Sequence, residues 1–290
     1  CSFHWDDIPA IVDNEAVRSG DAFAQLSTWA DINFRPLSMF TFFLNWQSGG
    51  SVVWPFHLVN FLIHMVTSIL VFYLTRYTVP LVLPDNRLEK RLVTAAALCA
   101  ALLFLLHPVQ TMAVTYIVQR MTGMAAMFSL LSLLCYVRAR VSAGARGKYA
   151  LYGASVLSWL LAVGSKEISF TLPFFVLLYE WFFFQDLQGP WLRRRLPAIS
   201  LVLAAGVILG LLYLRGHPWE TILAGYQDRD FTMGQRVLTE LRVVMMYLGL
   251  VFFPYPGRLN LDSDFPLSSS LVNPPTTLIA LLAITGRLGV

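Results

Sequence analysis

Residues 54–76 read WPFHLVNFLIHMVTSILVFYLTR, and this apolar run decides the fold class. A helix needs about 20 mostly apolar residues to cross the hydrocarbon core of a bilayer, so the run predicts a membrane-spanning helix. His57, Asn60 and His64 follow each other at i, i+3 and i+7 and therefore share one face of that helix. Polar groups are costly against lipid, so we expect this face to point into a bundle. Interhelical hydrogen bonding and contact with a substrate are the two roles that remain open for it.

The composition of the whole chain agrees with a polytopic membrane protein. Of its 290 residues 57% are hydrophobic and 13% are charged, with a mean hydropathy of +0.61. Soluble domains carry about 25% charged residues. The formal net charge is only +4, and no basic patch is interleaved with aromatic residues, so nucleic acid is not expected as a partner. The three cysteines, Cys1, Cys99 and Cys135, form no disulfide framework.

Further apolar runs predict an all-α transmembrane bundle of about seven to eight spans. The runs cover residues 92–106, 123–137, 149–164, 168–184, 197–214 and 237–253, and a last one begins at residue 278 and stops without a polar flank. Glu240 and Arg242 leave a re-entrant or cavity-lining helix open as the alternative for residues 237–253. Residues 37–46 are too few to cross a bilayer and predict an interfacial or re-entrant helix that begins at Pro36. We divide the chain into an external segment with the interfacial helix (1–53), a six-span core (54–214) and a truncated C-terminal part (215–290).

Basic linkers give the expected orientation. Lysine and arginine gather after every second predicted span, and such linkers face the cytoplasm. The same parity places residues 1–34, 107–120, 165–167 and 215–236 on the opposite side. For residues 254–275, charge favours the outside and strict alternation favours the inside, so both sides remain open.

The stretch FHWDDI at residues 3–8 holds the candidate catalytic acids Asp6 and Asp7. The flanking Trp5 and Ile8 would partly desolvate the pair, and proximity of two carboxylates raises one pKa. A carboxylate in that state could accept the proton of an incoming hydroxyl group. The alternative is that the two acids only solvate a loop.

Three cations fall on the same external side and are candidates for binding a phosphate leaving group: Arg35, Arg120 and Lys166. Snorkelling to the membrane interface is the alternative for the two arginines, and an ion pair with Glu167 is the alternative for Lys166. His107 ends a 15-residue run that covers roughly 22 Å, so we expect it to face a water-filled cleft.

Cofactor motifs are scarce. Asp262, Ser263 and Asp264 have the D-x-D form of a divalent-metal site, but no nucleotide-binding α/β pattern accompanies them. No zinc-ligand spacing, P-loop or serine-hydrolase motif occurs. We therefore expect no cofactor, with a divalent metal left open.

Six short motifs in series resemble a known family. They are FRPL at residues 34–37, FHLVN at 56–60 with His64, LHPVQT at 106–111, QR at 119–120, SKE at 165–167 with LP at 172–173, and RLNLD at 258–262 with DFP at 264–266. Together they look like the membrane half of bacterial GT-C glycosyltransferases that carry tetratricopeptide repeats. These enzymes are similar to the eukaryotic transmembrane and tetratricopeptide-repeat O-mannosyltransferases.

The resemblance implies a GT-C helical bundle in the bacterial inner membrane, a polyprenyl-phosphate-linked sugar donor, and transfer to protein or glycan hydroxyls at the periplasmic face. It also implies a first helix before residue 1 and repeats after residue 290. An acidic pair in the first external loop of the family matches Asp6 and Asp7. In this reading His107, Gln110, Glu167 and His57 orient the substrates. The chain departs from the eukaryotic relatives at Met112 and at residues 119–122, so the identity of the sugar is not carried over.

Three hypotheses follow for the function. The first is a glycosyltransferase in which Asp6 or Asp7 deprotonates the acceptor and Lys166, Arg120 and Arg35 bind the donor phosphate. The second is a non-catalytic membrane scaffold or assembly subunit with the same fold. The third is a carrier of lipid-linked sugars, which predicts inverted repeats that the sequence does not clearly contain.

Overall fold

The computed structural model forms two compact units, residues 1–193 and 194–290. It describes residues 2–19, 35–83, 89–142, 144–213, 218–227, 229–259 and 265–286. These described residues contain helices and turns and no β-strand, which confirms the all-α prediction. The predicted boundaries at residues 53 and 214 differ from the division into units.

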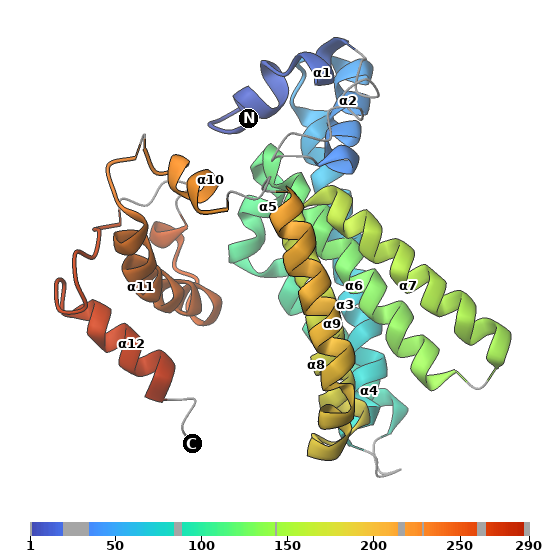
Figure 1. Cartoon of the computed structure of the whole chain (residues 1–290). Helices are drawn as coiled ribbons and strands as arrows, with labels where there is room; N and C mark the ends of the chain where they lie inside the picture. The colour runs from blue at the N-terminus through green and yellow to red at the C-terminus, as the bar shows by residue number, and fades with distance from the viewer. Residues whose placement is uncertain are drawn as a thin grey trace. The chain divides into compact units, whose positions relative to one another are not determined.

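The first unit contains eight α-helices among its described residues (Figure 1). They are α1 (Glu15–Ser19), α2 (Pro36–Gly49), α3 (Trp54–Val82), α4 (Lys90–Leu106), α5 (Thr111–Thr115), α6 (Arg120–Val141), α7 (Ala145–Ser165) and α8 (Leu172–Tyr179). Short 3-10 or π turns connect or extend them: η1 (Ile8–Val12), η3 (Pro108–Gln110), η4 (Ile117–Gln119), η5 (Glu167–Thr171) and η6 (Glu180–Phe184). Every span predicted within this unit is a helix, and α2 begins at Pro36 as expected.

The described residues do not support the predicted number of membrane-spanning helices. Among the described residues three helical segments are long and apolar enough to cross a bilayer: Trp54–Val82, Ile117–Val141 and Glu167–Phe184. A fourth results if Lys90–Leu106 and Pro108–Thr115, which meet at 49°, count as one broken span. The expected seven to eight spans are therefore not supported. Helix α12 (Thr276–Gly286) is apolar but too short to count as a span.

The bend after α4 has a local cause. Pro108 disfavours helical backbone at the residue before it, and His107 accordingly is extended, with φ −66° and ψ 125°. Helix α4 therefore ends at Leu106, and the chain re-enters helical geometry through η3 and α5. The prediction that the second run stops at His107 is confirmed.

One polar face of α3 forms hydrogen bonds with neighbouring segments of the first unit. His64 Nε2 lies 3.0 Å from the carbonyl of Leu105, and Ser68 donates to that of Ala101 at 2.9 Å. Asn60 donates to the carbonyl of Ile117 at 3.2 Å. The interpretation of this face as an interhelical hydrogen-bonding surface is thus the one that the structure supports for Asn60 and His64.

Helices α6 and α7 pack through a seam of small residues. In α6 the buried residues Ala125, Ser132 and Ala139 recur every seven positions, and Ser155 and Ala162 do so in α7. Ser132 and Ser155 each donate to the carbonyl of the other at 2.8 Å. Small side chains let helix backbones approach closely, which explains the close packing of these two helices.

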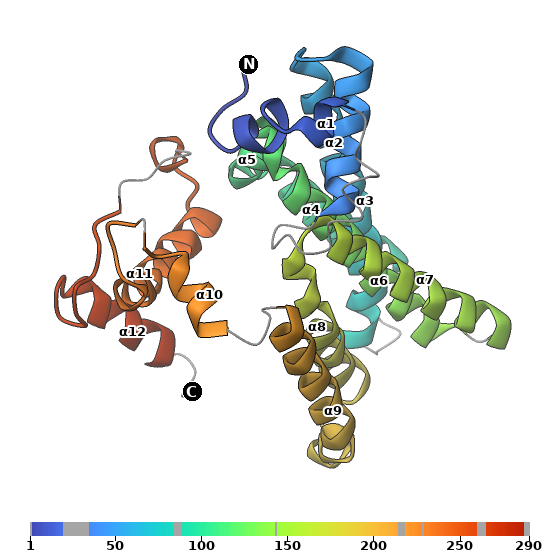
Figure 2. The same ribbon diagram turned by 45° about the horizontal axis from the view of Figure 1, so that its top comes forward.

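Within the first unit, the described parts of the segments predicted to be external (2–19, 107–120 and 165–167) lie together at one end. Figures 1 and 2 show α1, α2 and α5 at this end, where α6 begins and α7 ends. The opposite end holds the α6–α7 connection, where Arg138 and Arg146 are exposed and Lys148 is half-buried. The alternation read from the charges therefore agrees with the path of the chain in this unit.

The N-terminal segment packs against the bundle, although the sequence predicted a loop. Its described part forms η1 and α1, and Ile11 and Val17 are buried in a cluster with Phe42, Phe56 and Ile117. Apolar side chains along residues 8–17 supply the surface that docks on α2, α3 and η4. Residues 20–34 lie outside the described part.

The second unit contains α10 (Pro218–Ala224), α11 (Met233–Phe252) and α12, and α9 (Gly189–Tyr213) leads into it. Thr232 and Gln235 form a capping box at the start of α11. Ser268 links α11 to α12. Its amide donates to Thr239 Oγ1 at 2.8 Å, and its hydroxyl group shares a hydrogen bond of 2.8 Å with the hydroxyl group of Thr277. The Asp262–Asp264 motif lies outside the described residues.

Candidate functional site

A charged and polar cluster surrounds residues 116–122, which join α5 to α6 at the predicted external end. The N-terminal acids reach this segment through Tyr116 and Val118, and Lys166 reaches it through Thr122. Val118 and Thr122 are one helical turn apart, roughly 6 Å along an axis. The structure therefore brings the acidic pair and the lysine to the same end of the first unit from positions 160 residues apart in the chain.

Asp7 is buried and fully engaged. Its side chain accepts hydrogen bonds from the amide of Val118 at 2.7 Å and from that of His4 at 3.1 Å, and the residue is 1% exposed. Burial raises the pKa of Asp7, while the two amides and the nearby His4 and His57 partly oppose the rise. This geometry makes Asp7 an anchor that holds the N-terminal segment on the start of α6.

Asp6 is the exposed member of the pair. Its backbone amide donates to the hydroxyl of Tyr116 at 3.1 Å. Burial chiefly raises the pKa of Tyr116, and the charge and side-chain hydrogen bond of Asp6 raise it further. Trp5, which precedes Asp6, is 62% exposed and has a φ of +47°, a strained conformation for a bulky residue. The strained turn directs one carboxylate inward and leaves the other accessible.

Arg35 and Glu167 form a bidentate ion pair. Arg35 Nη2 lies 2.7 Å from Glu167 Oε1, and Nε lies 2.9 Å from Oε2. The side chain of Arg35 is 21% exposed and that of Glu167 is 56% exposed. The pair links the start of α2 to the start of η5, and it lies at the surface of the cluster.

Lys166 lies beside this pair. Its Nζ donates to Thr122 Oγ1 at 2.8 Å, and Thr122 donates to Gln119 Oε1 at 2.7 Å. Burial lowers the pKa of Lys166, the charge of Arg35 lowers it further, and the charge of Glu167 opposes the change. Helix α7 ends at Ser165, and the extended backbone of Lys166 turns its side chain toward α6.

Arg120 links the start of α6 to α2 and α3. The residue is 1% exposed, and its guanidinium donates to Asn60 Oδ1 at 2.8 Å and to the carbonyls of Phe56 at 3.0 Å and Thr41 at 3.1 Å. It also lies 4.6 Å from the ring centroid of Phe42. Because Arg120 is buried and its donors bind protein acceptors, its contacts favour a structural role over binding of phosphate.

The remaining predicted residues lie around the cluster. His57 Nδ1 lies 3.3 Å from the carbonyl of Val114, and its Nε2 is buried with no hydrogen-bond partner among the described residues. His107 Nδ1 accepts from the amide of Val109 at 3.2 Å, and Gln110 is partly buried at the start of α5. The roles of these residues in orienting substrate stay predictions.

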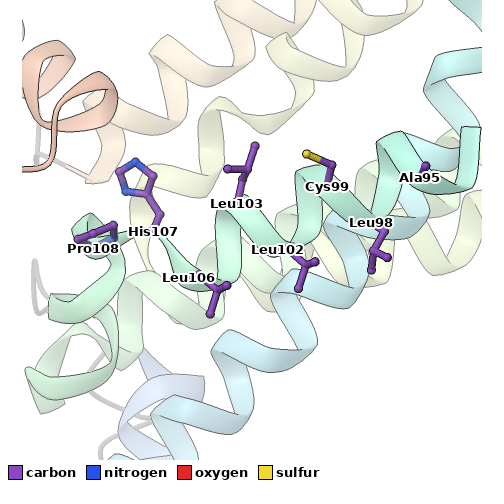
Figure 3. Close-up of a pocket in the computed structure, with 8 residues that line it drawn as sticks. All are labelled: Ala95, Leu98, Cys99, Leu102, Leu103, Leu106, His107 and Pro108. Atoms are coloured by element: carbon purple, nitrogen blue, oxygen red, sulfur yellow. The ribbon is translucent and has the colours of Figure 1, made fainter. Parts of the chain in front are cut away.

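An apolar groove of about 510 Å³ runs along α4 and ends at His107 and Pro108 (Figure 3). The remaining described lining residues are Ala95, Leu98, Cys99, Leu102, Leu103 and Leu106. The sequence predicted a water-filled cleft beside His107, whereas the groove that His107 borders in the structure is lined almost entirely by apolar side chains. His107 is its polar end.

Sequence reasoning missed three residues of the cluster: Tyr116, Gln119 and Thr122. Thr122 stood out only as a departure from the family's pattern, and nothing in its surroundings in the chain indicated contact with Lys166. Within the described residues no group of three or more His, Cys, Asp or Glu could hold a metal ion. The predicted D-x-D site is outside that part of the chain.

The fold and the cluster define an α-helical protein with helices long enough to cross a membrane and a charged site at one end. Its curated relatives are protein O-mannosyl-transferases. TMTC2 of Mus musculus is 32% identical over 212 residues, which are 70% of this chain and 22% of the relative. TMTC4 of Homo sapiens is 35% identical over 152 residues, 47% of this chain and 20% of the relative. TMTC2 of Drosophila melanogaster is 30% identical over 218 residues, 70% of this chain and 22% of the relative.

The chain thus spans about a fifth of the length of these relatives. No family model matches the chain, and no solved structure is similar to it. The resemblance to the O-mannosyltransferases is supported by the relatives, whereas they do not test a bacterial origin.

Proposed function

We propose that this protein is a glycosyltransferase that moves a sugar from a polyprenyl-phosphate-linked donor to hydroxyl groups of protein acceptors. The main support is the gathering of an exposed carboxylate, Asp6, with the cations Arg35 and Lys166 at one end of the first unit. The names of the relatives, which are protein O-mannosyl-transferases, agree with this class of reaction.

Asp6 acts as the general base in this proposal. The proton of the acceptor hydroxyl moves to the Asp6 carboxylate, the acceptor oxygen bonds to the anomeric carbon, and the bond from that carbon to the phosphate oxygen breaks. Polyprenyl phosphate leaves with both electrons of the broken bond. Tyr116 and Asp7 hold the backbone of this turn in place, so they are positioning residues.

Arg35 and Lys166 stabilise the negative charge that develops on the phosphate. Cations aimed at developing charge are typically the largest contributors to such catalysis. Thr122 and Gln119 hold the ammonium of Lys166, and its lowered pKa reflects the partly desolvated position that strengthens electrostatic contacts. His107, Gln110, His57 and Glu167 would orient the two substrates.

The membrane setting follows from the helices. The cluster belongs on the non-cytoplasmic side, because the basic α6–α7 connection lies at the other end of the unit. In a bacterial inner membrane that side is the periplasm. We assign the helical bundle to the GT-C class as part of this proposal.

A transfer assay with the purified full-length protein tests the base. Asp6→Asn should lower the rate of sugar transfer by about 10²–10⁴-fold, because it removes the proton acceptor. Asp13→Asn is the matched control, since Asp13 is an exposed acid of the same segment. Full activity of Asp6→Asn would remove the proposed mechanism.

A non-catalytic scaffold is the second candidate function. It is favoured by the engagement of Asp7, Arg120 and Arg35 in contacts within the protein. A scaffold predicts that Asp6→Asn and Lys166→Met leave the assembly of its complex unchanged and that wild type shows no sugar transfer.

A further inference from the structure

The contact between Arg35 and Glu167 occupies the part of Arg35 best suited to bind phosphate. Two guanidinium N–H groups, from Nε and Nη2, meet the two oxygens of one carboxylate at 2.9 and 2.7 Å. The same planar fork matches two oxygens of a phosphate. A phosphate can therefore bind this edge of Arg35 only after Glu167 moves away.

We propose that Glu167 is a positioning residue that occupies the phosphate's place on Arg35 and exchanges with the phosphate as donor binds and product leaves. This inference rests on the proposed function. The carboxylate holds the guanidinium in the orientation that the phosphate needs and keeps it from folding against other acceptors. The Glu167 side chain is 56% exposed, so solvent accommodates it after it leaves Arg35.

The neighbouring cation does not take part in the exchange. Lys166 is fixed by its contact with Thr122 at 2.8 Å and stays in place when Glu167 moves. With the ion pair closed, the three charged groups Arg35, Lys166 and Glu167 carry a net charge of about +1. With Glu167 turned outward, two cations face the phosphate, which is the stronger anion site.

The exchange also bears on product release. Transfer of the sugar converts a phosphodiester of charge about −1 into polyprenyl phosphate of charge about −2 at neutral pH. Two cations would hold that product tightly. Return of Glu167 to Arg35 competes with the product and shortens its stay, and product release limits turnover in many enzymes.

The test measures binding of farnesyl phosphate to the purified full-length protein in detergent, with farnesol as the uncharged control. Glu167→Gln should bind farnesyl phosphate about two- to fivefold more tightly than wild type. An exposed ion pair contributes about 0.2–1 kcal/mol, and loss of a competitor of that strength lowers the Kd by about this factor. Glu167→Asp, whose shorter side chain reaches Arg35 less well, should fall between them. Glu240→Gln breaks a similar exposed pair with Arg236 and should leave the affinity unchanged.

The outcomes separate the two proposals. Equal or weaker binding by Glu167→Gln, with wild type binding normally, would overturn the exchange and leave the phosphate site standing. Failure of wild type and of both Glu167 variants to prefer farnesyl phosphate to farnesol would overturn the phosphate site and the exchange together. A static ion pair would loosen the fold in Glu167→Gln without any gain in affinity.

Discussion

Replacing Arg120 by alanine distinguishes a structural tie from a phosphate-binding cation. In the structure the substitution removes the arginine donor from Asn60 Oδ1 and from the carbonyls of Phe56 and Thr41, together with a longer contact to Thr41 Oγ1 at 3.4 Å. Each buried acceptor that loses its partner costs about 1–3 kcal/mol. Contacts of the guanidinium with the rings of Phe42 and Phe56 are lost as well.

An opposing contribution reduces this sum. The described partners of Arg120 are neutral, and removing a buried cation relieves a desolvation penalty of several kcal/mol. The net result is a loss of roughly 3 kcal/mol in the free energy of unfolding for Arg120→Ala. Arg120→Lys keeps the charge but not the fork that reaches three acceptors, so about half of the loss should remain.

Arg35→Ala is the matched comparison. Its ion pair with Glu167 lies at the surface, and such pairs contribute about 0.2–1 kcal/mol. Unfolding of each purified variant in mixed micelles, followed by circular dichroism, measures stability, and farnesyl phosphate binding measures the site. We expect Arg120→Ala to lose stability and Arg35→Ala to lose binding. Wild-type stability of Arg120→Ala together with lost phosphate affinity would refute the reasoning and restore Arg120 to the site.

Three further predictions follow from the same contacts. Ser132→Leu should lower the free energy of unfolding by about 1–3 kcal/mol, because the α6–α7 seam has no room for a larger side chain. Ser132→Ala, which fits the seam, is the control in the same unfolding experiment. Burial raises the pKa of Asp7 above 3.8, so the contribution of this group to stability is present at acid pH and is lost as the pH rises through the folded-state pKa. Asp7→Asn should remove this pH dependence from a series of unfolding curves. An unchanged series would contradict the buried position of the carboxylate. The pKa of Lys166 is lowered, so the charged form disfavours the fold and stability falls as the pH falls through the folded-state pKa. Lys166→Met should therefore raise Tm at neutral pH while weakening farnesyl phosphate binding, whereas Lys148→Met at the other end should change neither.

The chain's pattern of runs and linkers was sufficient to predict the path of the first unit. Helix α3, the stop at His107 and the common end of residues 35, 107–120 and 166 all follow from apolar length and from the sign of the linkers. These features depend on the mean hydropathy and the charge of whole segments. A bilayer strongly restricts which segments can cross it and which can face the cytoplasm. The polar face of α3 was predicted for the same reason, because three polar residues at helical spacing cannot all face lipid.

The direction of each charged side chain was not predictable in this way. Arg120 points inward because Asn60 and two backbone carbonyls, far away in the sequence, offer acceptors there. Asp7 is buried and Asp6 is exposed although they are neighbours, because the amide of Val118 donates a hydrogen bond to the carboxylate of Asp7. The predicted number of spans is not supported among the described residues, because several apolar runs in the sequence correspond to helices that are too short or not apolar enough to count as crossings.

A structure of the full-length protein in a lipid nanodisc with a non-hydrolysable polyprenyl-phosphate sugar tests the account most directly. We predict density for the phosphate within hydrogen-bond distance of Arg35 and Lys166, with Glu167 turned away and the anomeric carbon facing Asp6. Phosphate density at the opposite end of the first unit, or a closed Arg35–Glu167 pair beside a bound donor, would contradict it.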